Sequence, residues 1–307
     1  MLLQISLIKT NLLTLTLLQL LTHLEMSLTL NQLRDYSSLF SRGEVIKWLK
    51  NDFKSIDIKL DRYNSYNKNK GNSYLQVLRK TYKSLEKYYP NEYVLKNEFL
   101  NQWLIKELGT RNSIIFNEFR TGKAIADLAM FNGVSKAFEI KTILDKEYRL
   151  SNQIKEYKKI FNEVYIVVPN IFLNKYKNYD DNLGLITYES STKKFELIQK
   201  PKRNYDLDID VLMEVLHTKE YVEIVKSYYE ELPKMNSFNQ FEICKELISG
   251  IPKIELNNIF IDSMKKRKRN NSFFKDIYQE FNQIFLSLNF EQKDRDKLMN
   301  NLKLNTV

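Results

Sequence analysis

The stretch from Ile125 to Thr142 constrains the fold of this chain more than any other part of the sequence. Two short runs in which apolar residues alternate flank Asn132-Gly133. Asn and Gly tolerate positive φ, so this dipeptide between two such runs is a strong signal for a β-hairpin. The first run carries Asp127, and the second carries Glu139 and Lys141. Alternate residues of a strand share a face, so the sequence predicts that Glu139 and Lys141 project together.

The register of this hairpin decides whether Asp127 joins them. A two-residue loop pairs Phe131 with Val134 and places Asp127 and Glu139 on opposite faces. A three-residue loop, or one bulge, pairs Phe131 with Ser135 and places Asp127 opposite Glu139. Only the second register gives a consistent apolar underside, since a slip of one residue exchanges the faces. We therefore predict an odd loop with Gly133 in a left-handed conformation, or a bulge near it.

Two carboxylates directly opposite each other repel and need a cation beside them. Oxygen ligands suit Mg²⁺ or Mn²⁺ better than zinc, so Asp127, Glu139 and the backbone carbonyl of Ile140 are candidate metal ligands. A lysine beside such an ion can hold a water or offset charge on a phosphate, which makes Lys141 a candidate catalytic residue. This is the chemistry of metal-assisted phosphodiester hydrolysis.

The pattern of an Asp followed by Glu-x-Lys on the next strand resembles the PD-(D/E)xK nuclease superfamily, with Ala126 in place of the Pro. The run also resembles a bacterial group of that superfamily in which the Phe/Tyr-Glu-Ile-Lys strand precedes Arg-Leu-x-x-Gln-x-x-x-Tyr and a Val-rich strand. The corresponding residues here are Phe138 to Lys141, then Asp145, Arg149, Leu150, Gln153, Tyr157 and Val164 to Val168.

This resemblance covers Ser113 to Asn170. It implies an α/β fold with a restriction-endonuclease-like core, in which helices flank a mixed central sheet. It also implies that Gln153 and Tyr157 contact nucleic acid or orient the catalytic groups. The alternative is that Tyr157 is a core aromatic and Gln153 a surface residue.

Two further acids have positions that fit the same resemblance. Glu118, on the strand expected over residues 113–119, is a candidate accessory ligand. Glu98, on the helix expected from Asn91 to Leu108, is a candidate additional acid. Ordinary surface charge is the alternative explanation for both residues.

The charge of the chain fits a polyanionic partner. The 307 residues carry a net charge of +10, which favours nucleic acid as a partner. If the chain is a nuclease, as the resemblance implies, we expect DNA rather than RNA as the substrate. A Lys- and Asn-rich codon bias is the alternative. The single cysteine, Cys244, and only two histidines disfavour a disulfide framework, a zinc site and a histidine-based triad. We expect a cytoplasmic protein with no membrane partner.

Hydrophobic periodicity divides the chain into four parts. Residues 1–25 are a Leu- and Thr-rich leader, with Met26 as an alternative start; an amphipathic helix or a membrane anchor are further alternatives. Residues 26–90 are helical, 91–201 form the nuclease-like core, and 202–307 are helical again and offer a surface for a homodimer or a protein partner. One basic run at a helix end can bind phosphates or favour the helix dipole: Lys265, Lys266, Arg267, Lys268 and Arg269, with Arg149 as a further phosphate ligand.

The sequence therefore predicts a Mg²⁺- or Mn²⁺-dependent deoxyribonuclease, a hydrolase of defence or mobile-element biology. A second hypothesis is a catalytically silent protein of the same fold that binds nucleic acid or a protein partner. A third is a hairpin whose acids and lysine are ordinary surface charges.

Overall fold

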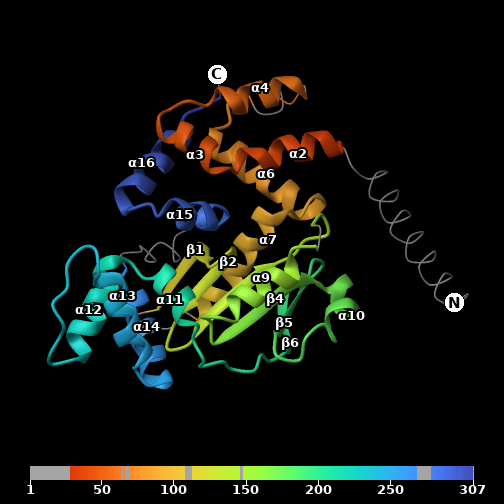
Figure 1. Cartoon of the computed structure of the whole chain (residues 1–307). Helices are drawn as coiled ribbons and strands as arrows, with labels where there is room; N and C mark the ends of the chain where they lie inside the picture. The colour runs from red at the N-terminus through yellow and green to blue at the C-terminus, as the bar shows by residue number, and fades with distance from the viewer. Residues whose placement is uncertain are drawn as a thin grey trace, which may run out of the picture. The chain divides into compact units, whose positions relative to one another are not determined.

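The computed structural model describes residues 28–63, 65, 70–107, 113–145, 148–267 and 278–306. The chain divides into two compact units, residues 1–90 with 297–307 and residues 91–296 (Figure 1). The predicted boundary after Pro90 coincides with this division. The predicted C-terminal region does not stand alone, since residues 202–296 belong to the unit that contains the sheet. The predicted leader, residues 1–25, and the alternative start lie outside the described residues.

The first unit is helical, as the periodicity predicts. The longest of its helices begins with a capping box in which the hydroxyl of Ser73 accepts from the backbone N–H of Gln76, and it ends two residues before Pro90. The end of the chain returns to this unit, where the Asn301 amide donates to the Trp48 carbonyl at 3.0 Å. Its helices are α2 (Leu30–Leu39), α3 (Arg42–Leu49), α4 (Lys54–Arg62), α6 (Tyr74–Tyr88) and the last part of α16 (Gln292–Leu302).

The second unit is built on a six-stranded mixed sheet with the strand order β1-β2-β3-β4-β5-β6. Strands β1 to β3 are antiparallel, β3, β4 and β5 are parallel, and β5 and β6 are antiparallel. This confirms the predicted α/β class with a mixed central sheet. The strands are β1 (Ile114–Thr121), β2 (Ala124–Phe131), β3 (Ser135–Ile140), β4 (Glu163–Pro169), β5 (Gly184–Glu189) and β6 (Lys194–Gln199).

The central hairpin has the register that the apolar pattern favours. Phe131 pairs with Ser135 and Leu128 with Phe138, so three residues, 132–134, form the loop. Gly133 has a φ of +96°, a conformation that glycine adopts without a steric penalty. The prediction of an odd loop with positive φ at this glycine is confirmed.

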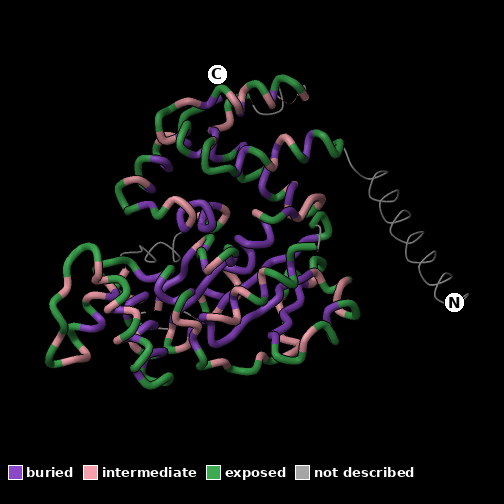
Figure 2. Tube along the Cα trace, viewed as in Figure 1, coloured by how far each residue is buried: buried purple, intermediate pink, exposed green. Residues whose placement is uncertain are grey.

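Helices cover both faces of the sheet, and strands β2 to β5 are largely buried, whereas the edge strand β6 is half-buried to exposed (Figure 2). On one face, α9 (Leu150–Tyr157) packs on β2 and shares an apolar core with α11, α13 and α14. On the other face, Phe99 of α7 meets the ring of Phe138 with centroids 5.2 Å apart. Since Ala137 belongs to the first core and Phe138 contacts α7, the alternation along β3 separates the two groups of helices.

The remaining elements that the structure describes in this unit are helices. The helix expected from Asn91 to Leu108 widens to a π-helix at its centre. The elements are α7 (Glu92–Phe99), η1 (Leu100–Leu104), α8 (Ile105–Glu107), η2 (Asn170–Phe172), α10 (Leu173–Tyr176), α11 (Ile209–Val215), α12 (Thr218–Tyr228), α13 (Gln240–Ser249), α14 (Lys253–Lys266), η4 (Gln279–Phe281) and α15 (Asn282–Leu288). Among the described residues, no helix is both long and apolar enough to cross a membrane.

Candidate functional site

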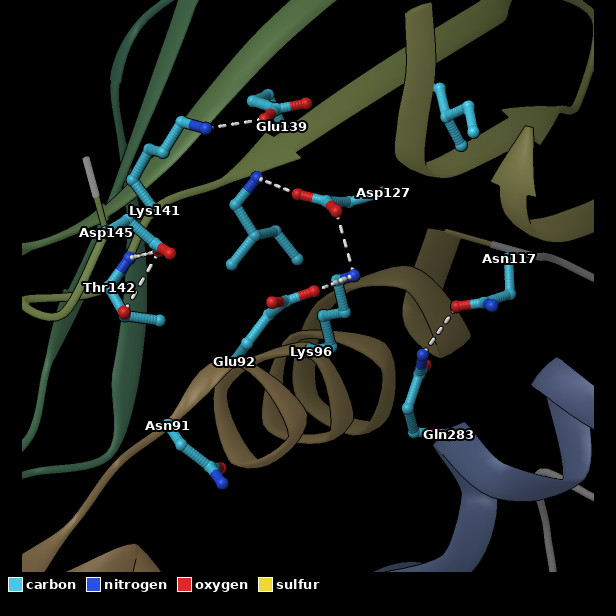
Figure 3. A network of polar contacts seen from close by, with 12 residues as sticks. Asn91, Glu92, Lys96, Asn117, Asp127, Glu139, Lys141, Thr142, Asp145 and Gln283 are labelled. Atoms are coloured by element: carbon cyan, nitrogen blue, oxygen red, sulfur yellow. Dashed lines mark hydrogen bonds and ion pairs between the residues drawn. The ribbon is translucent and has the colours of Figure 1, made fainter. Parts of the chain in front are cut away.

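Glu139 and Lys141 meet at the carboxyl end of β3, as their spacing predicts. The Lys141 backbone amide donates to the Val167 carbonyl at 2.9 Å, which holds this residue beside β4 just after β3 ends. The Lys141 ammonium donates to Glu139 Oε1 at 2.6 Å (Figure 3). The side chains of Glu139 and Lys141 are 3% and 10% exposed, so this ion pair is largely withdrawn from water.

Helix α9 supplies the two other predicted residues. The Tyr157 hydroxyl lies 2.6 Å from Glu139 Oε2 and 2.7 Å from the carbonyl oxygen of Ile125. The Gln153 amide connects this hydroxyl with the Lys141 ammonium, with both of its contacts at 3.4 Å. Tyr157 is fully buried, so it is a core aromatic and also a partner of the candidate catalytic acid. The structure thus brings Glu139, Lys141, Gln153 and Tyr157 into one hydrogen-bonded chain.

Asp127 lies next to this chain but has its own partners. Beyond the Leu128–Phe138 pair the ladder between β2 and β3 ends, and the Ile140 backbone amide donates to Asp127 Oδ2 at 2.7 Å. Asp127 Oδ1 lies 2.8 Å from the ammonium of Lys96, which α7 supplies (Figure 3). The Ile140 amide lies between Glu139 and Lys141 in the chain, so Asp127 is a neighbour of both residues.

Lys96 is a residue that sequence reasoning missed. It is 5% exposed and also pairs with Glu92, one helical turn earlier. The i, i+4 spacing of Glu92 and Lys96 is readable in the sequence, but nothing there indicates that Asp127 is the third partner. Glu98, the acid proposed on this helix, instead accepts from the Gln102 amide at 2.6 Å.

Glu118 interrupts the ladder on the other side of Asp127. Asn117 pairs with Leu128 and Phe119 with Ala126, while Glu118 between them has a φ of +53° and an exposed side chain. A non-glycine residue in this region is strained, and such strain is typical of functional sites. Among the residues described, no three His, Cys, Asp or Glu side chains gather as metal ligands, so Glu118 does not join Asp127 and Glu139 in such a group.

Burial and mutual repulsion favour the protonated forms of the two acids. Burial raises the pKa of the Asp127 carboxyl above its ordinary value, although the Lys96 ammonium opposes the rise. Burial and then the charge of Asp127 raise the pKa of Glu139, against the effect of Lys141. Burial alone would lower the pKa of Lys96, but Asp127 and Glu92 outweigh it and raise that pKa. Burial and the charge of Glu139 raise the pKa of the Tyr157 hydroxyl, which therefore keeps its proton.

The charges at the site leave room for a cation. When the carboxyl groups of Glu92, Asp127 and Glu139 are all ionised, they face the two ammonium groups of Lys96 and Lys141, so the formal sum of charges is −1. Two buried carboxylates with raised pKa values and hard oxygen ligands suit Mg²⁺ or Mn²⁺. Each of the four oxygens of Asp127 and Glu139 already has a hydrogen-bond donor, however, so an ion has to displace one of them.

Helix α7 is fixed in this position by the segment that begins α15. The Gln283 backbone amide donates to Asn97 Oδ1 at 3.0 Å, and the Gln283 side-chain amide donates to Asn117 Oδ1 at 2.5 Å (Figure 3). The Asn97 amide donates to the Gln279 carbonyl at 3.0 Å. Residues nearly two hundred positions apart thus connect the helix that carries Lys96 to β1 beside Glu118.

The predicted phosphate ligands lie apart from this constellation. The Arg149 guanidinium is exposed and lies 5.1 Å from the Tyr148 ring. The three described members of the basic run pair with acids: Lys265 with Asp262, Lys266 with Glu223, and Arg267 with Glu220. Arg267 also donates to the Val215 carbonyl at 2.7 Å and is 17% exposed, so it is engaged within the protein. Lys268 and Arg269 lie outside the described residues.

Comparison with known proteins gives one family. A sequence model of the family described as bacteriophage P4 protein cII matches residues 85–303. Protein cII of Enterobacteria phage P4 is 30% identical over 176 residues, which are 55% of this chain and 64% of that protein. The chain thus spans just under two thirds of the length of this relative. Among solved structures, the SPO1766 protein of unknown function from Silicibacter pomeroyi matches 47% of this chain and 94% of its own, with 13% identity and a TM-score of 0.30.

Proposed function

This chain belongs to the bacteriophage P4 protein cII family, and we propose that it is a divalent-metal-dependent nuclease that hydrolyses phosphodiester bonds, of DNA rather than RNA. The observation that carries the proposal is the hydrogen-bonded chain of Glu139, Lys141, Gln153 and Tyr157 beside Asp127. We further propose that β1 to β4 with α7 and α9 form a restriction-endonuclease-like core. The setting that fits is the cytoplasm, in defence or mobile-element biology.

The residues that would hold Mg²⁺ or Mn²⁺ are Asp127, Glu139 and the carbonyl of Ile140. Such an ion, when bound, lowers the pKa of a water and offsets charge on the phosphate. Lys141 supplies a positive charge within the site and donates to the attacking water or to a phosphate oxygen. Tyr157 fixes the orientation of Glu139, because its hydroxyl keeps its proton and lies 2.6 Å from the carboxylate.

The net charge of +10 supports a nucleic-acid substrate, and binding that depends on it weakens as salt rises. The basic run contributes less than its composition suggests, because its described members are paired with acids. A protein partner or a second copy at the helices after residue 202 remains a prediction.

A cleavage assay tests the proposal. Single-stranded, duplex and branched DNA are incubated with the full chain in Mg²⁺, Mn²⁺ or EDTA. We expect metal-dependent cleavage, and Asp127→Asn should reduce the rate at least about a hundredfold while circular dichroism stays unchanged. The matched control is Asp180→Asn, since the Asp180 carboxylate, like that of Asp127, accepts from a lysine ammonium and a backbone amide, those of Lys158 at 2.6 Å and Asn182 at 2.9 Å. An Asp127→Asn variant that cleaves at the wild-type rate contradicts the proposal.

One observation favours a second candidate, a protein of this fold that binds nucleic acid without cleaving it. The Lys96 ammonium already occupies the Asp127 oxygen that faces α7. A protein that neither binds a divalent ion nor cleaves DNA, but binds DNA with a salt-dependent affinity, fits this second function.

A further inference from the structure

A pocket of about 430 Å³ opens at the carboxyl ends of β3 and β4, next to the candidate catalytic lysine. Its walls come from Lys141 and Asp145 after β3, from Tyr148 before α9, and from Phe172 and Lys175 after β4. The carboxyl ends of parallel strands are where ligands bind in open α/β sheets, and the volume lies in the range of ligand sites. No residue named above as a metal ligand or as part of the basic run lines this pocket.

The side chains of the pocket combine an exposed ring, that of Tyr148, and a half-buried ring, that of Phe172, with positive charge. Tyr148 is 70% exposed, although large aromatic rings are usually covered. The Arg149 guanidinium lies 5.1 Å from the Tyr148 ring, and the Lys175 ammonium lies 5.8 Å from the Phe172 ring. Among the lining residues that the structure describes, Asp145 is the one acid, and it accepts from Thr142, so it stabilises the turn after β3. Rings beside cations suit a flat, electron-rich ligand that carries a phosphate.

We propose that this pocket binds one unpaired nucleotide of the nucleic-acid strand, with the base against Tyr148 and Phe172 and a phosphate near Lys175. The proposal rests on the proposed function, since Lys141 borders both sites. A base can lie against an aromatic ring only when it is not stacked in a duplex, so the pocket selects single-stranded or frayed ends. The substrate preference of the enzyme then comes from this pocket.

Exposed aliphatic side chains follow β3 and β4 at the same edge of the sheet as the pocket, and they are consistent with binding of a nucleotide base there. Ile143 and Leu144 are 53% and 50% exposed, and Ile171 is 61% exposed. Apolar side chains beside an aromatic platform exclude water from the faces of a bound base. A protein partner is the other ligand for such a surface, and the test below separates the two.

The test measures binding in EDTA, where no metal-dependent cleavage takes place. A fluorescein-labelled oligothymidylate strand and a labelled blunt-ended, GC-rich duplex without unpaired nucleotides are titrated with the full chain, and anisotropy is recorded. We expect tighter binding of the single strand, and Tyr148→Ala should weaken it about tenfold without changing the affinity for the duplex. Tyr148→Phe should retain the wild-type affinity because it keeps the ring. Lys175→Ala should weaken binding of the single strand severalfold, whereas Lys177→Ala, an exposed neighbour outside the pocket, should not.

Several outcomes overturn the inference. The inference is contradicted if the wild type binds the single strand and the duplex with equal affinity. It is also contradicted if Tyr148→Ala binds the single strand as tightly as the wild type does, or if this variant loses as much affinity for the duplex as for the single strand. Absence of DNA binding to the wild type also contradicts it and leaves a protein-docking surface as the use of the pocket. Because binding is measured without metal, loss of the single-strand preference in Tyr148→Ala supports the pocket even if the wild type cleaves nothing. If Tyr148→Ala cleaves DNA and binds the single strand as tightly as the wild type does, the proposed nuclease activity is supported and the proposed nucleotide pocket is rejected.

Discussion

The Lys96 ammonium lies 2.8 Å from Asp127 Oδ1, inside the protein and on the side of the carboxylate that Ile140 does not occupy. A buried carboxylate needs a compensating positive charge, and in the metal-free protein a lysine provides it. In the proposed nuclease, a divalent ion on Asp127 would therefore compete with an internal cation. We propose that this competition would set the affinity of the site for metal.

Replacing Lys96 with Met should expose this competition. In EDTA, Lys96→Met should lower the melting temperature, since it leaves Asp127 buried without its charged partner, a loss of about 3–5 kcal/mol for such pairs. Mg²⁺ or Mn²⁺ should then raise the melting temperature of Lys96→Met more than that of the wild type, because ligand binding to the native state stabilises it. Differential scanning fluorimetry across a metal titration provides the measurement.

The control for this substitution is Lys136→Met. Lys136 lies on β3 and pairs with Glu107, and the two side chains are 14% and 29% exposed. Lys136→Met should lower the melting temperature, but metal should raise the melting temperature of this variant no more than that of the wild type. If Lys96→Met responds to metal no more than the wild type does, Lys96 does not compete with an ion.

Removing the Tyr157 hydroxyl should affect catalysis as well as stability. Tyr157→Phe leaves Glu139 Oε2 and the Ile125 carbonyl without this donor, a cost of about 1–3 kcal/mol. The pKa of Glu139 should rise further, so the cleavage rate should reach its plateau at a higher pH. Tyr165→Phe is the matched control, because Tyr165 is also buried and donates to Glu163 at 2.7 Å. Tyr165→Phe should lower the unfolding free energy by a similar amount and leave the pH profile of cleavage unchanged. If the two variants have the same pH profile, Tyr157 has no role in setting the pKa of Glu139.

The stability of the metal-free protein should fall as pH rises through the titration of Asp127. Burial raises the pKa of the Asp127 carboxyl in the native state above its ordinary value, so the native state binds more protons than the unfolded state at pH values between the two. The unfolding free energy of the wild type, relative to that of Asp127→Asn, should therefore decrease from acid to neutral pH. Chemical denaturation in EDTA at several pH values measures this difference, and an increase would mean that the pKa of Asp127 is lowered in the native state. Metal binding should follow the opposite trend and strengthen with pH, because the ligands must lose their protons.

Arg267 should matter for stability and not for nucleic-acid binding. Its guanidinium donates to both carboxylate oxygens of Glu220, at 2.7 and 2.6 Å, and to the Val215 carbonyl. Arg267→Ala should lower the unfolding free energy by about 1.5–3 kcal/mol, the value of hydrogen bonds to charged groups. The salt dependence of DNA binding should keep its slope. A shallower slope in Arg267→Ala would return this residue to the phosphate-binding role that the sequence predicts.

The parts of the site that local patterns specify could be predicted from the sequence. Alternation along two strands selects the register that pairs Phe131 with Ser135, because a slip of one residue would expose the apolar face. The spacing of four residues between Gln153 and Tyr157 places both on the side of α9 that faces Glu139.

The parts that depend on distant segments could not be predicted. Lys96 reaches Asp127 only because α7 is held by Gln283, and no local pattern relates these three residues. The positive φ of Glu118 has no signal either, since glutamate rarely adopts it. A run of basic residues suggests a phosphate-binding site, but the acids that pair with Lys266 and Arg267, Glu223 and Glu220, lie more than forty positions away in the sequence.

The measurement that tests the account most directly is a Mn²⁺ titration followed by electron paramagnetic resonance, with Mg²⁺ as competitor. The account predicts saturable Mn²⁺ binding that Mg²⁺ displaces, weakened at least about tenfold in Asp127→Asn and in Glu139→Gln and unchanged in Asp180→Asn. A wild-type chain that binds no Mn²⁺, or an Asp127→Asn variant that binds it as tightly as the wild type, would contradict the claim that these two carboxylates share a divalent ion.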